Sequence, residues 1–343
     1  MAGLVAAAQA RALGADVIVY EKRGRAGGSM WLSSGVVWRH RDFARFRSEC
    51  QGGDKGLQRL VFDRLDRDVE WLESLGVPVI GRETGNELTA GVRFDTEGLT
   101  AALQRAAGDV RLSQPLVEPP PDSPVVLATG GYPADRELLR EHVTDQADHL
   151  FLRAAPGNAG DGLRLGVAAG GATSTGLDEI YGRNMPAPPA RVAADDYVGL
   201  AQLYARHAEV RNEAGRLYEA RTWSETDVVQ WTARQPRARA WFRVAQDSLD
   251  VRVRDRTVAE MVDGAEASGA PVRREDGATT VETVAGVTST LGGLAIDIHG
   301  RVAPGVYAAG DDAGGIATGG YASGLAAALV LGRVTARAAL EDA

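Results

Sequence analysis

The chain has 343 residues, of which 44% are hydrophobic and 24% are charged, with a formal net charge of -8; this length suits two domains, because a single core seldom grows past about 250–300 residues. The excess of acidic residues argues against a nucleic-acid partner, since phosphate contacts need a basic face. No apolar run reaches the roughly 18 residues of a membrane span, and the single cysteine, Cys50, excludes an internal disulfide and a cysteine-rich metal site and fits a cytoplasmic protein.

The first residues have a pattern typical of the second part of a dinucleotide-binding βαβ unit. Gly3 stands where the third glycine of G-x-G-x-x-G would fall, an alanine-rich helix is predicted at residues 4–13, and a β-branched strand at residues 16–20 ends at Glu21. In such a unit the helix N-terminus contacts a pyrophosphate, and the acid accepts hydrogen bonds from ribose hydroxyls. The alternative interpretation is an ordinary helix followed by a strand, without a ligand.

A loop rich in glycine and serine, KRGRAGGSMWLSSGVVW, follows Glu21. Its backbone amides can lie against a flat or anionic ligand without interference from side chains. Beyond it, the pattern predicts helices at residues 43–50, 56–75 and 96–107 and a short strand at residues 91–94.

A turn-rich connector, PLVEPPPDSP, separates these elements from the next strand. The apolar residues 125–128 predict a buried strand. This strand ends in Thr129, Gly130 and Gly131.

The remainder of the chain contains a second domain and a closing helix. Residues 134–288 have a mixed pattern, with helical segments near residues 195–206 and 223–234. A helix of small residues is predicted at residues 323–340. The five histidines show no spacing typical of metal ligands, so no metal site is expected.

Four separated segments carry a family resemblance: AGL…EK…GGS…SSG, VVLATGGY, GNAGDGLRLGVAAGGA and TLGGLAID…PGVYAAGDDAGG…GLAAALVLGR. In this order they resemble the flavoprotein family of fumarate reductase, succinate dehydrogenase and 3-ketosteroid dehydrogenase. The resemblance implies an α/β fold with a split, Rossmann-like FAD-binding domain in residues 1–131 and 291–343. An α+β capping domain in residues 132–290 is then inserted between the two parts.

The same resemblance implies which residues hold the FAD. Ala2 lies where the fingerprint meets the pyrophosphate, Glu21 binds ribose, and Asp311 binds the ribityl hydroxyls in place of the glutamate that is usual in the family. The helix that begins near Gly324 points its N-terminus at the pyrimidine ring of the flavin, where positive potential stabilises the anionic reduced form. The implied cofactor-binding set is Ala2, Gly3, Glu21, Lys22, Gly28, Ser29, Met30, Ser34, Gly35, Val36, Ala128, Thr129, Gly130, Asp161, Gly310, Asp311, Gly324, Ala326 and Ala327.

Within this set, the loop from Ser29 to Val36 is implied to run under the flavin and the ribityl chain, and Ala128 and Thr129 to lie beside the adenosine. Asp161 matches an acid of the family that contacts the cofactor. No histidine matches a covalent attachment site, so FAD is expected to bind noncovalently. Taken singly, these residues also have structural explanations as turn glycines, a helix cap or tightly packed alanines.

The chain departs from the family at the catalytic positions. Fumarate reductases use an arginine as proton donor and histidines to hold the substrate carboxylates, but Tyr321 replaces that arginine, Thr288 replaces one histidine and the other falls near Tyr181. A dicarboxylate site is therefore not expected. Tyr181 and Tyr321 instead resemble the tyrosine-rich sites of ketosteroid dehydrogenases, and Arg183 nearby could lower the phenol pKa and polarise an oxygen. The alternative is that both tyrosines are structural aromatic residues.

The resemblance therefore implies an FAD-dependent oxidoreductase of the CH–CH group, which dehydrogenates a ketone or reduces an enone or enoate. Its partners are a small-molecule substrate and an external electron donor or acceptor. Two alternatives stay open: a degenerate or truncated homologue without FAD, which acts as a binding protein or is a non-functional fragment, and an NAD-dependent dehydrogenase with the same first motif.

The first strand and the first two glycines of the fingerprint would precede Met1. A central strand bonds to neighbours on both sides, and each unsatisfied backbone group costs about 1–3 kcal/mol. We therefore expect the natural chain to extend upstream, and the chain that begins at Met1 to bind FAD weakly or to be colourless and partly unfolded.

Overall fold

A computed structural model describes residues 1–120, 122–221 and 225–342, and it divides into two compact units. Unit 1 contains Met1–Asp135, Ala154–Glu179 and Ser289–Ala343, and unit 2 contains Arg136–Arg153 and Ile180–Thr288. Residues 154–179, which the sequence analysis assigned to the capping domain, are grouped with unit 1. The bounds of the two functional domains stay a prediction.

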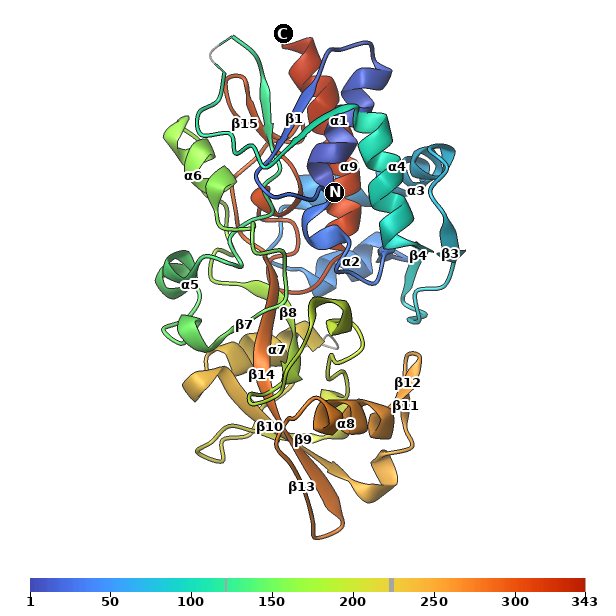
Figure 1. Ribbon diagram of the computed structural model, residues 1–343, viewed down its shortest axis with the longest axis vertical. Helices are drawn as coiled ribbons and strands as arrows, with labels where there is room; N and C mark the ends of the chain where they lie inside the picture. The colour runs from blue at the N-terminus through green and yellow to red at the C-terminus, as the bar shows by residue number, and fades with distance from the viewer. Residues whose placement is uncertain (121, 222–224, 343) are drawn as a thin grey trace. The chain divides into compact units, whose positions relative to one another are not determined.

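Unit 1 contains both ends of the chain (Figure 1). Its helices are α1 (Ala2–Ala12), α2 (Phe43–Glu49), α3 (Lys55–Ser74), α4 (Thr96–Ala107), α6 (Asp161–Ala168) and α9 (Gly324–Glu341), with short 3-10 helices at Gly28–Met30 and Gly310–Asp312. Its strands are β1 (Ile18–Glu21), β2 (Val36–His40), β3 (Val79–Gly81), β4 (Thr89–Phe94), β5 (Asp109–Leu112), β6 (Val125–Leu127), β15 (Arg301–Ala303) and β16 (Val306–Ala308).

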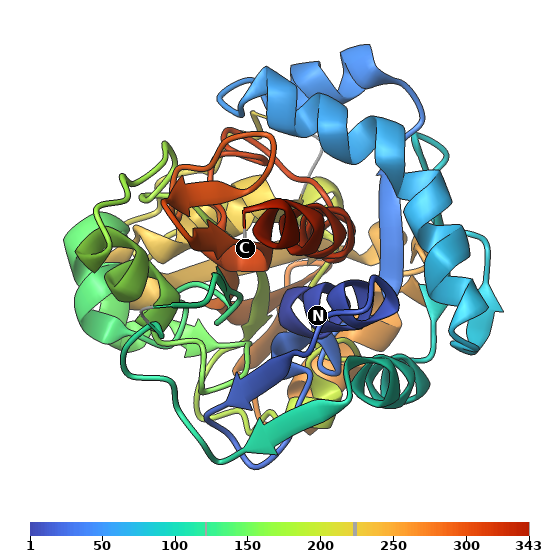
Figure 2. The ribbon, with the colours of Figure 1, turned by 90° about the horizontal axis from the view of Figure 1, so that it is seen from above.

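The strands of unit 1 form three small sheets. β1 and β5 pair in parallel, as the blue and teal strands in Figure 2 show. β16 lies between β15 and β6 and is parallel to β6. β4 lies between β2 and β3, and both of these pairs are antiparallel. Parallel strands joined through helices confirm the predicted α/β class.

The helices α1 and α9 pack side by side because both present small residues (Figure 2). Five of the eleven residues of α1 are buried alanines, and a Cβ on Gly332 of α9 would lie 2.7 Å from the carbonyl oxygen of Ala2. Residues without bulk at this contact let the two backbones approach closely. The N-terminus of α1 is thereby fixed against the body of unit 1.

A buried polar cluster also joins these helices to α3. The Arg333 guanidinium on α9 donates to the side-chain oxygen of Gln9 at 2.7 Å and pairs with the carboxylate of Asp68, which is 0% exposed. Buried charges are tolerated when they are paired and hydrogen-bonded. This cluster lies among the packing residues of α1, α3 and α9.

Unit 2 is built around a sheet in the order β13-β14-β10-β9, with β7 and β8 also paired to β14. Its helices are α5 (Arg136–His142), α7 (Glu225–Ala233) and α8 (Val258–Ala267), with short 3-10 helices at Ala147–His149, Ala194–Asp196, Ala205–His207, Pro236–Ala238 and Gln246–Ser248. Its strands are β7 (Phe151–Leu152), β8 (Ile180–Pro186), β9 (Glu209–Arg211), β10 (Arg239–Ala245), β11 (Arg252–Val253), β12 (Arg256–Thr257), β13 (Val272–Glu275) and β14 (Ala278–Thr290).

One predicted helix of unit 2 is wrong. Residues 195–206 contain only parts of two short 3-10 helices, and residues 201–205 are buried in succession rather than on one helical face. The backbone amide of Gln202 donates to the carbonyl of Asn184 on β8 at 2.9 Å and not to a carbonyl of a preceding helical turn. The helix predicted at residues 223–234 is found as α7, while residues 222–224 lie outside the described residues.

In the described parts of the chain, no helix combines the length and the apolar character needed to cross a lipid bilayer.

Candidate cofactor site

The N-terminus of α1 and the ends of β6 and β16 meet in unit 1. A Cβ on Gly3 would lie 3.3 Å from the Cβ of Ala128, which follows β6. A Cβ on Gly310, which follows β16 and has a φ of +69°, would lie 3.1 Å from the Cβ of Ala2. Glycine at both positions keeps these backbones close, so four residues of the predicted set are brought together.

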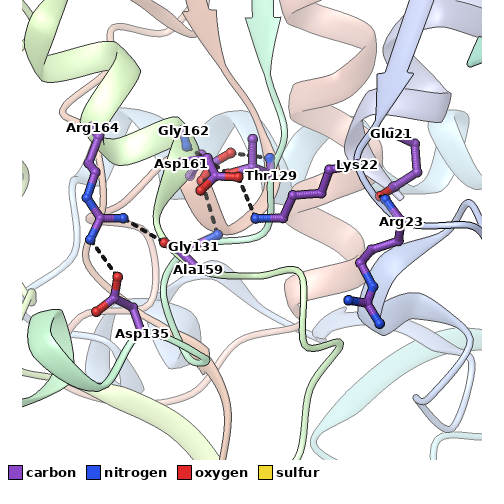
Figure 3. Close-up of polar contacts among 11 residues, drawn as sticks. Glu21, Lys22, Arg23, Thr129, Gly131, Asp135, Ala159, Asp161, Gly162 and Arg164 are labelled. Atoms are coloured by element: carbon purple, nitrogen blue, oxygen red, sulfur yellow. Dashed lines mark hydrogen bonds and ion pairs between the residues drawn. The ribbon is translucent and has the colours of Figure 1, made fainter. Parts of the chain in front are cut away.

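Glu21 is the last residue of β1, and Lys22 follows it (Figure 3). One carboxylate oxygen of Glu21 accepts a hydrogen bond from the backbone amide of Arg23 at 2.8 Å, which fixes the direction of the side chain. The Lys22 ammonium extends to the carboxylate of Asp161 at 2.5 Å, as the dashed line in Figure 3 shows. Asp161 opens α6, so this ion pair ties the end of β1 to the first turn of α6.

The glycine-rich loop is held by the segment before α6. The Ser29 hydroxyl accepts hydrogen bonds from the backbone amide of Ala155 at 2.9 Å and from the side-chain amide of Asn158 at 3.0 Å. A Cβ on Gly130 would lie 2.5 Å from the amide nitrogen of Asn158. Asn158 therefore connects the predicted flavin loop, where Met30 is buried, to the turn after β6.

Gly35 needs to be glycine for two reasons. Its φ is +72°, and a Cβ there would overlap the carbonyl oxygen of Phe94. The next residue, Val36, begins β2 and pairs with Arg93 of β4. Ser34 is exposed, and its carbonyl accepts a hydrogen bond from the Arg93 guanidinium at 3.2 Å.

Asp311 lies beside the N-terminus of α9. A Cβ on Gly324, the first residue of α9, would lie 3.7 Å from a carboxylate oxygen of Asp311. The Ser323 hydroxyl caps the helix by accepting from the amide of Ala326 at 3.2 Å, and the amide of Ala327 donates to the Ser323 carbonyl at 3.1 Å. Burial, and then the neighbouring carboxylate of Asp312, raises the pKa of Asp311 to about 7.

The sequence analysis missed Asp312, which is the better buried of the two acids, at 1% exposed. Its carboxylate accepts hydrogen bonds from the backbone amide of Thr129, from the Thr129 hydroxyl at 3.0 Å and from the backbone amide of Gly131 at 3.0 Å. Burial raises its pKa, while these donors favour the ionised form. The sequence shows that Asp311 and Asp312 are adjacent, but it does not show which of the two carboxylates the fold buries more completely. Asn158 was missed too, although it stands in one of the quoted segments.

The residues of this site fit an FAD molecule in their chemistry. Glu21 and Asp311 are acceptors suited to sugar and ribityl hydroxyls, and among the described residues no hydrogen-bond donor reaches the Asp311 carboxylate. The first turn of α9 contributes positive potential beside Asp311. Thr129 is bonded to Asp312, and Lys22 and Asp161 are bonded to each other.

Tyr321, the candidate proton-transfer residue of unit 1, stands at the end of the loop before α9. Its ring lies 5.2 Å from that of Trp38 on β2, measured between centroids. The imidazole of His40, whose pKa burial lowers, lies 3.4 Å from the Tyr321 carbonyl through Nε2. The loop before α9 is also held by Gln58, whose side-chain amide donates to the carbonyl of Ile316 at 2.8 Å.

Tyr181 and Arg183 belong to β8 of unit 2. The Arg183 guanidinium lies over the Tyr181 ring, 4.8 Å from its centroid, and Arg183 is only 4% exposed. It donates to the carbonyl of Gly182 at 2.8 Å. Burial raises the pKa of the Glu225 carboxyl to about 7, and Arg183 opposes that rise. The structure thus pairs the predicted phenol and guanidinium of unit 2, and their role in proton transfer stays a prediction.

Among the described residues no group of His, Cys, Asp or Glu is arranged to hold a metal ion.

A family model described as "FAD binding domain" matches residues 1–118 and 121–325. A comparison with curated protein sequences found no significant match. Among solved structures, the open conformation of a flavocytochrome c3 fumarate reductase has a TM-score of 0.72 and 19% identity, over 99% of this chain and 76% of that one.

Two ketosteroid dehydrogenases are also similar in structure. The 3-ketosteroid Δ4-(5α)-dehydrogenase of Rhodococcus jostii has a TM-score of 0.70 and 18% identity, over 98% of this chain and 94% of that one. The 3-ketosteroid Δ1-dehydrogenase of Sterolibacterium denitrificans has a TM-score of 0.71 and 14% identity, over 99% of this chain and 97% of that one. At these identities the likeness concerns the fold.

Proposed function

The chain belongs to the FAD binding domain family, and from that premise we propose that it is an FAD-dependent oxidoreductase that acts on a carbon–carbon bond next to a carbonyl group. The reaction is the dehydrogenation of a ketone or the reduction of an enone or enoate. The observation that carries the cofactor assignment is the Asp311 carboxylate, which lies beside the first turn of α9 with no donor from the described residues.

In this proposal the residues of unit 1 bind and orient the cofactor. Glu21 accepts hydrogen bonds from the adenosine ribose, and its link to Arg23 keeps the carboxylate in place. Asp311 accepts from the ribityl chain, and the N-terminus of α9 stabilises negative charge on the neighbouring ring. When bound, FAD supplies a centre that accepts or donates hydride at N5.

We assign the transfer of the proton at the carbon next to the carbonyl to the phenol group of a tyrosine. Tyr321 is held by Trp38, and Tyr181 is held by Arg183. A guanidinium near a phenol favours the ionised form, and it can also polarise a carbonyl oxygen. In a dehydrogenation the phenolate takes the proton while hydride leaves the adjacent carbon, and a reduction runs the same transfers in reverse. An external electron donor or acceptor completes the turnover.

The side chains that replace the histidines and the arginine of fumarate reductases indicate the substrate class. Tyrosine and threonine at these positions carry no positive charge for a dicarboxylate, so a neutral ketone or enone is favoured.

Anaerobic mixing of the FAD-loaded protein with a panel of saturated cyclic ketones tests the proposal, with succinate as the comparison. Loss of the flavin absorbance with a ketone and not with succinate is expected. Bleaching by succinate alone would contradict the proposed substrate class, and a lack of bleaching by every ketone, together with no oxidation of the reduced form by enones, would contradict the proposed reaction.

A further inference from the structure

The buried carboxylate of Asp312 is stabilised by hydrogen bonds from backbone amides and a hydroxyl and, in the described part of the chain, not by a basic side chain. Among residues 1–120, 122–221 and 225–342, no lysine, arginine or histidine forms an ion pair with it. The other enclosed acid of unit 1, Asp68, is paired with Arg333. A carboxylate removed from water costs several kcal/mol unless other groups replace its hydration.

The groups that replace the hydration of the Asp312 carboxylate belong to one short turn, residues 129–131. Thr129 donates both its backbone amide and its hydroxyl, and Gly131 donates its backbone amide. Gly130 and Gly131 have φ values of +92° and +67°, a conformation that turns successive amides inward. The turn is therefore wrapped around the carboxylate of Asp312.

The same carboxylate is linked to the first turn of α6. The backbone amide of Gly162 donates to the Thr129 hydroxyl at 2.9 Å, and that hydroxyl donates to Asp312. A Cβ on Gly162 would lie 2.5 Å from an oxygen of Asp312, so α6 packs directly on the acid. Figure 3 shows Thr129, Gly131 and Gly162 gathered at this point, next to Asp161 and the Lys22 side chain that reaches it.

Three segments of the cofactor site thus depend on one side chain. They are the turn after β6, the start of α6 with its ion pair to Lys22, and the Gly310–Asp312 segment that carries Asp311. Asp312 touches all three, whereas Asp311 is the acid that faces α9.

We propose that Asp312 is a positioning residue of the cofactor site: its carboxylate is an internal anion that holds the Thr129–Gly131 turn and the first turn of α6 against Asp311, and so sets the affinity for FAD. This inference rests on the assignment of the FAD site to unit 1. The carboxylate acts through Thr129 and Gly131 and has no contact with the cofactor.

The test measures FAD affinity and the stability of the apoprotein in matched variants. Asp312→Asn keeps the size of the side chain and removes the charge that three donors recognise. We expect it to weaken FAD binding by about tenfold or more, because hydrogen bonds to a charged group are stronger than those to a neutral amide. Asp68→Asn removes an equally buried charge in the helix cluster; it should lower the midpoint of urea unfolding and leave the FAD dissociation constant within about twofold.

Thr129 provides a second, milder test if Asp312→Asn does not fold. Thr129→Val removes the hydroxyl that links Asp312 to Gly162, and it should weaken FAD binding; Thr129→Ser restores the hydroxyl and should restore the affinity. When both single variants fold, the combined Asp312→Asn, Thr129→Val variant should lose less affinity than the sum of the two, because both changes break the same link.

Wild-type affinity in folded Asp312→Asn, or equal affinities in Thr129→Val and Thr129→Ser, would overturn the proposal. Glu21→Ala in the same assay separates this failure from a failure of the site assignment. If Glu21→Ala weakens FAD binding and Asp312→Asn does not, only the role of Asp312 is wrong. If neither variant changes the affinity, FAD does not bind at these residues, and both the site assignment and the role of Asp312 are wrong.

Discussion

The indole ring of Trp38 lies against the phenol ring of Tyr321, with their centroids 5.2 Å apart and their planes tilted by 57°. The backbone of Tyr321 is held as well, because its carbonyl lies within reach of the imidazole of His40. Trp38 and His40 both belong to β2, so one strand fixes the ring and the backbone of the residue to which we assign proton transfer.

Tyr321→Phe should leave FAD bound and slow substrate-dependent bleaching of the flavin by about 10²-fold or more, the usual size of a general acid–base contribution. Stopped-flow absorbance gives the rate, and Tyr181→Phe is measured in parallel. Tyr307→Phe is the matched control, since the Tyr307 hydroxyl bonds to Ala338 and Asp342 at the end of α9 and should not affect the rate. Unchanged rates in both Tyr321→Phe and Tyr181→Phe would refute the assignment of the proton to a phenol.

Glu21→Ala should weaken FAD binding by about tenfold or more, because a charged acceptor for the ribose hydroxyls is lost. The fold should not change, since Glu21 lies at the end of an edge strand and its described side-chain bond is to the nearby Arg23. Titration of flavin fluorescence gives the affinity. FMN provides an internal comparison, because it has no adenosine ribose; if the variant loses equal affinity for FMN and FAD, Glu21 does not contact the ribose.

Asp311→Asn should change how stability depends on pH. Burial raises the pKa of Asp311 to about 7 in the folded chain, whereas an aspartate in an unfolded chain titrates near pH 4. The folded state therefore binds this proton more tightly, and the contribution of Asp311 to stability is largest at low pH and falls as the pH rises through about 7.

The free energy of unfolding of the apoprotein, relative to Asp311→Asn, should accordingly decrease between about pH 5 and about pH 8, because the variant is neutral throughout. Urea unfolding at several pH values measures both proteins under identical conditions. A difference that stays constant, or that grows with pH, would show that Asp311 is not a carboxyl with a raised pKa.

Gly35→Ala should destabilise unit 1 by about 2 kcal/mol or more, because the left-handed backbone strains an L residue and the new Cβ overlaps the Phe94 carbonyl. Gly28→Ala is the control: its φ is +54°, but a Cβ there would meet no atom within 4 Å. It should cost only about 1 kcal/mol. Thermal unfolding of the two variants compares them, and equal losses would contradict the close contact at Gly35.

Local signals predicted most elements of unit 1. The helix at residues 96–107 is found with the predicted bounds, because Asp95 caps its first turn and Gly108 ends it. The stretch at residues 195–206 was predicted wrongly, since its polar and apolar spacing resembles a helix while the backbone amide of Gln202 bonds to Asn184 on a distant strand. Pairing between segments far apart in the chain overrides a local pattern of this kind.

Local sequence signals likewise identify some residues of the candidate site and not others. Glu21 and Asp311 were implied by the family resemblance because they stand at or after the ends of strands, and their contacts with FAD stay a prediction. Asp312 could not be predicted, since its role depends on amides of Thr129 and Gly131, which lie far from it in the sequence. The partner of Ser29 could not be predicted either, because Asn158 reaches it only through the tertiary fold.

The identity of the bound cofactor decides whether unit 1 holds the proposed FAD site. The purified protein is incubated with FAD, freed of excess ligand and scanned, and the cofactor released by denaturation is identified by chromatography. We predict oxidised-flavin bands near roughly 370 and 450 nm and complete release of unmodified FAD, since we expect the binding to be noncovalent. A protein that takes up no FAD at any concentration, or that binds FMN or NADP in preference to FAD, would contradict the proposed site and the oxidoreductase reaction that depends on it.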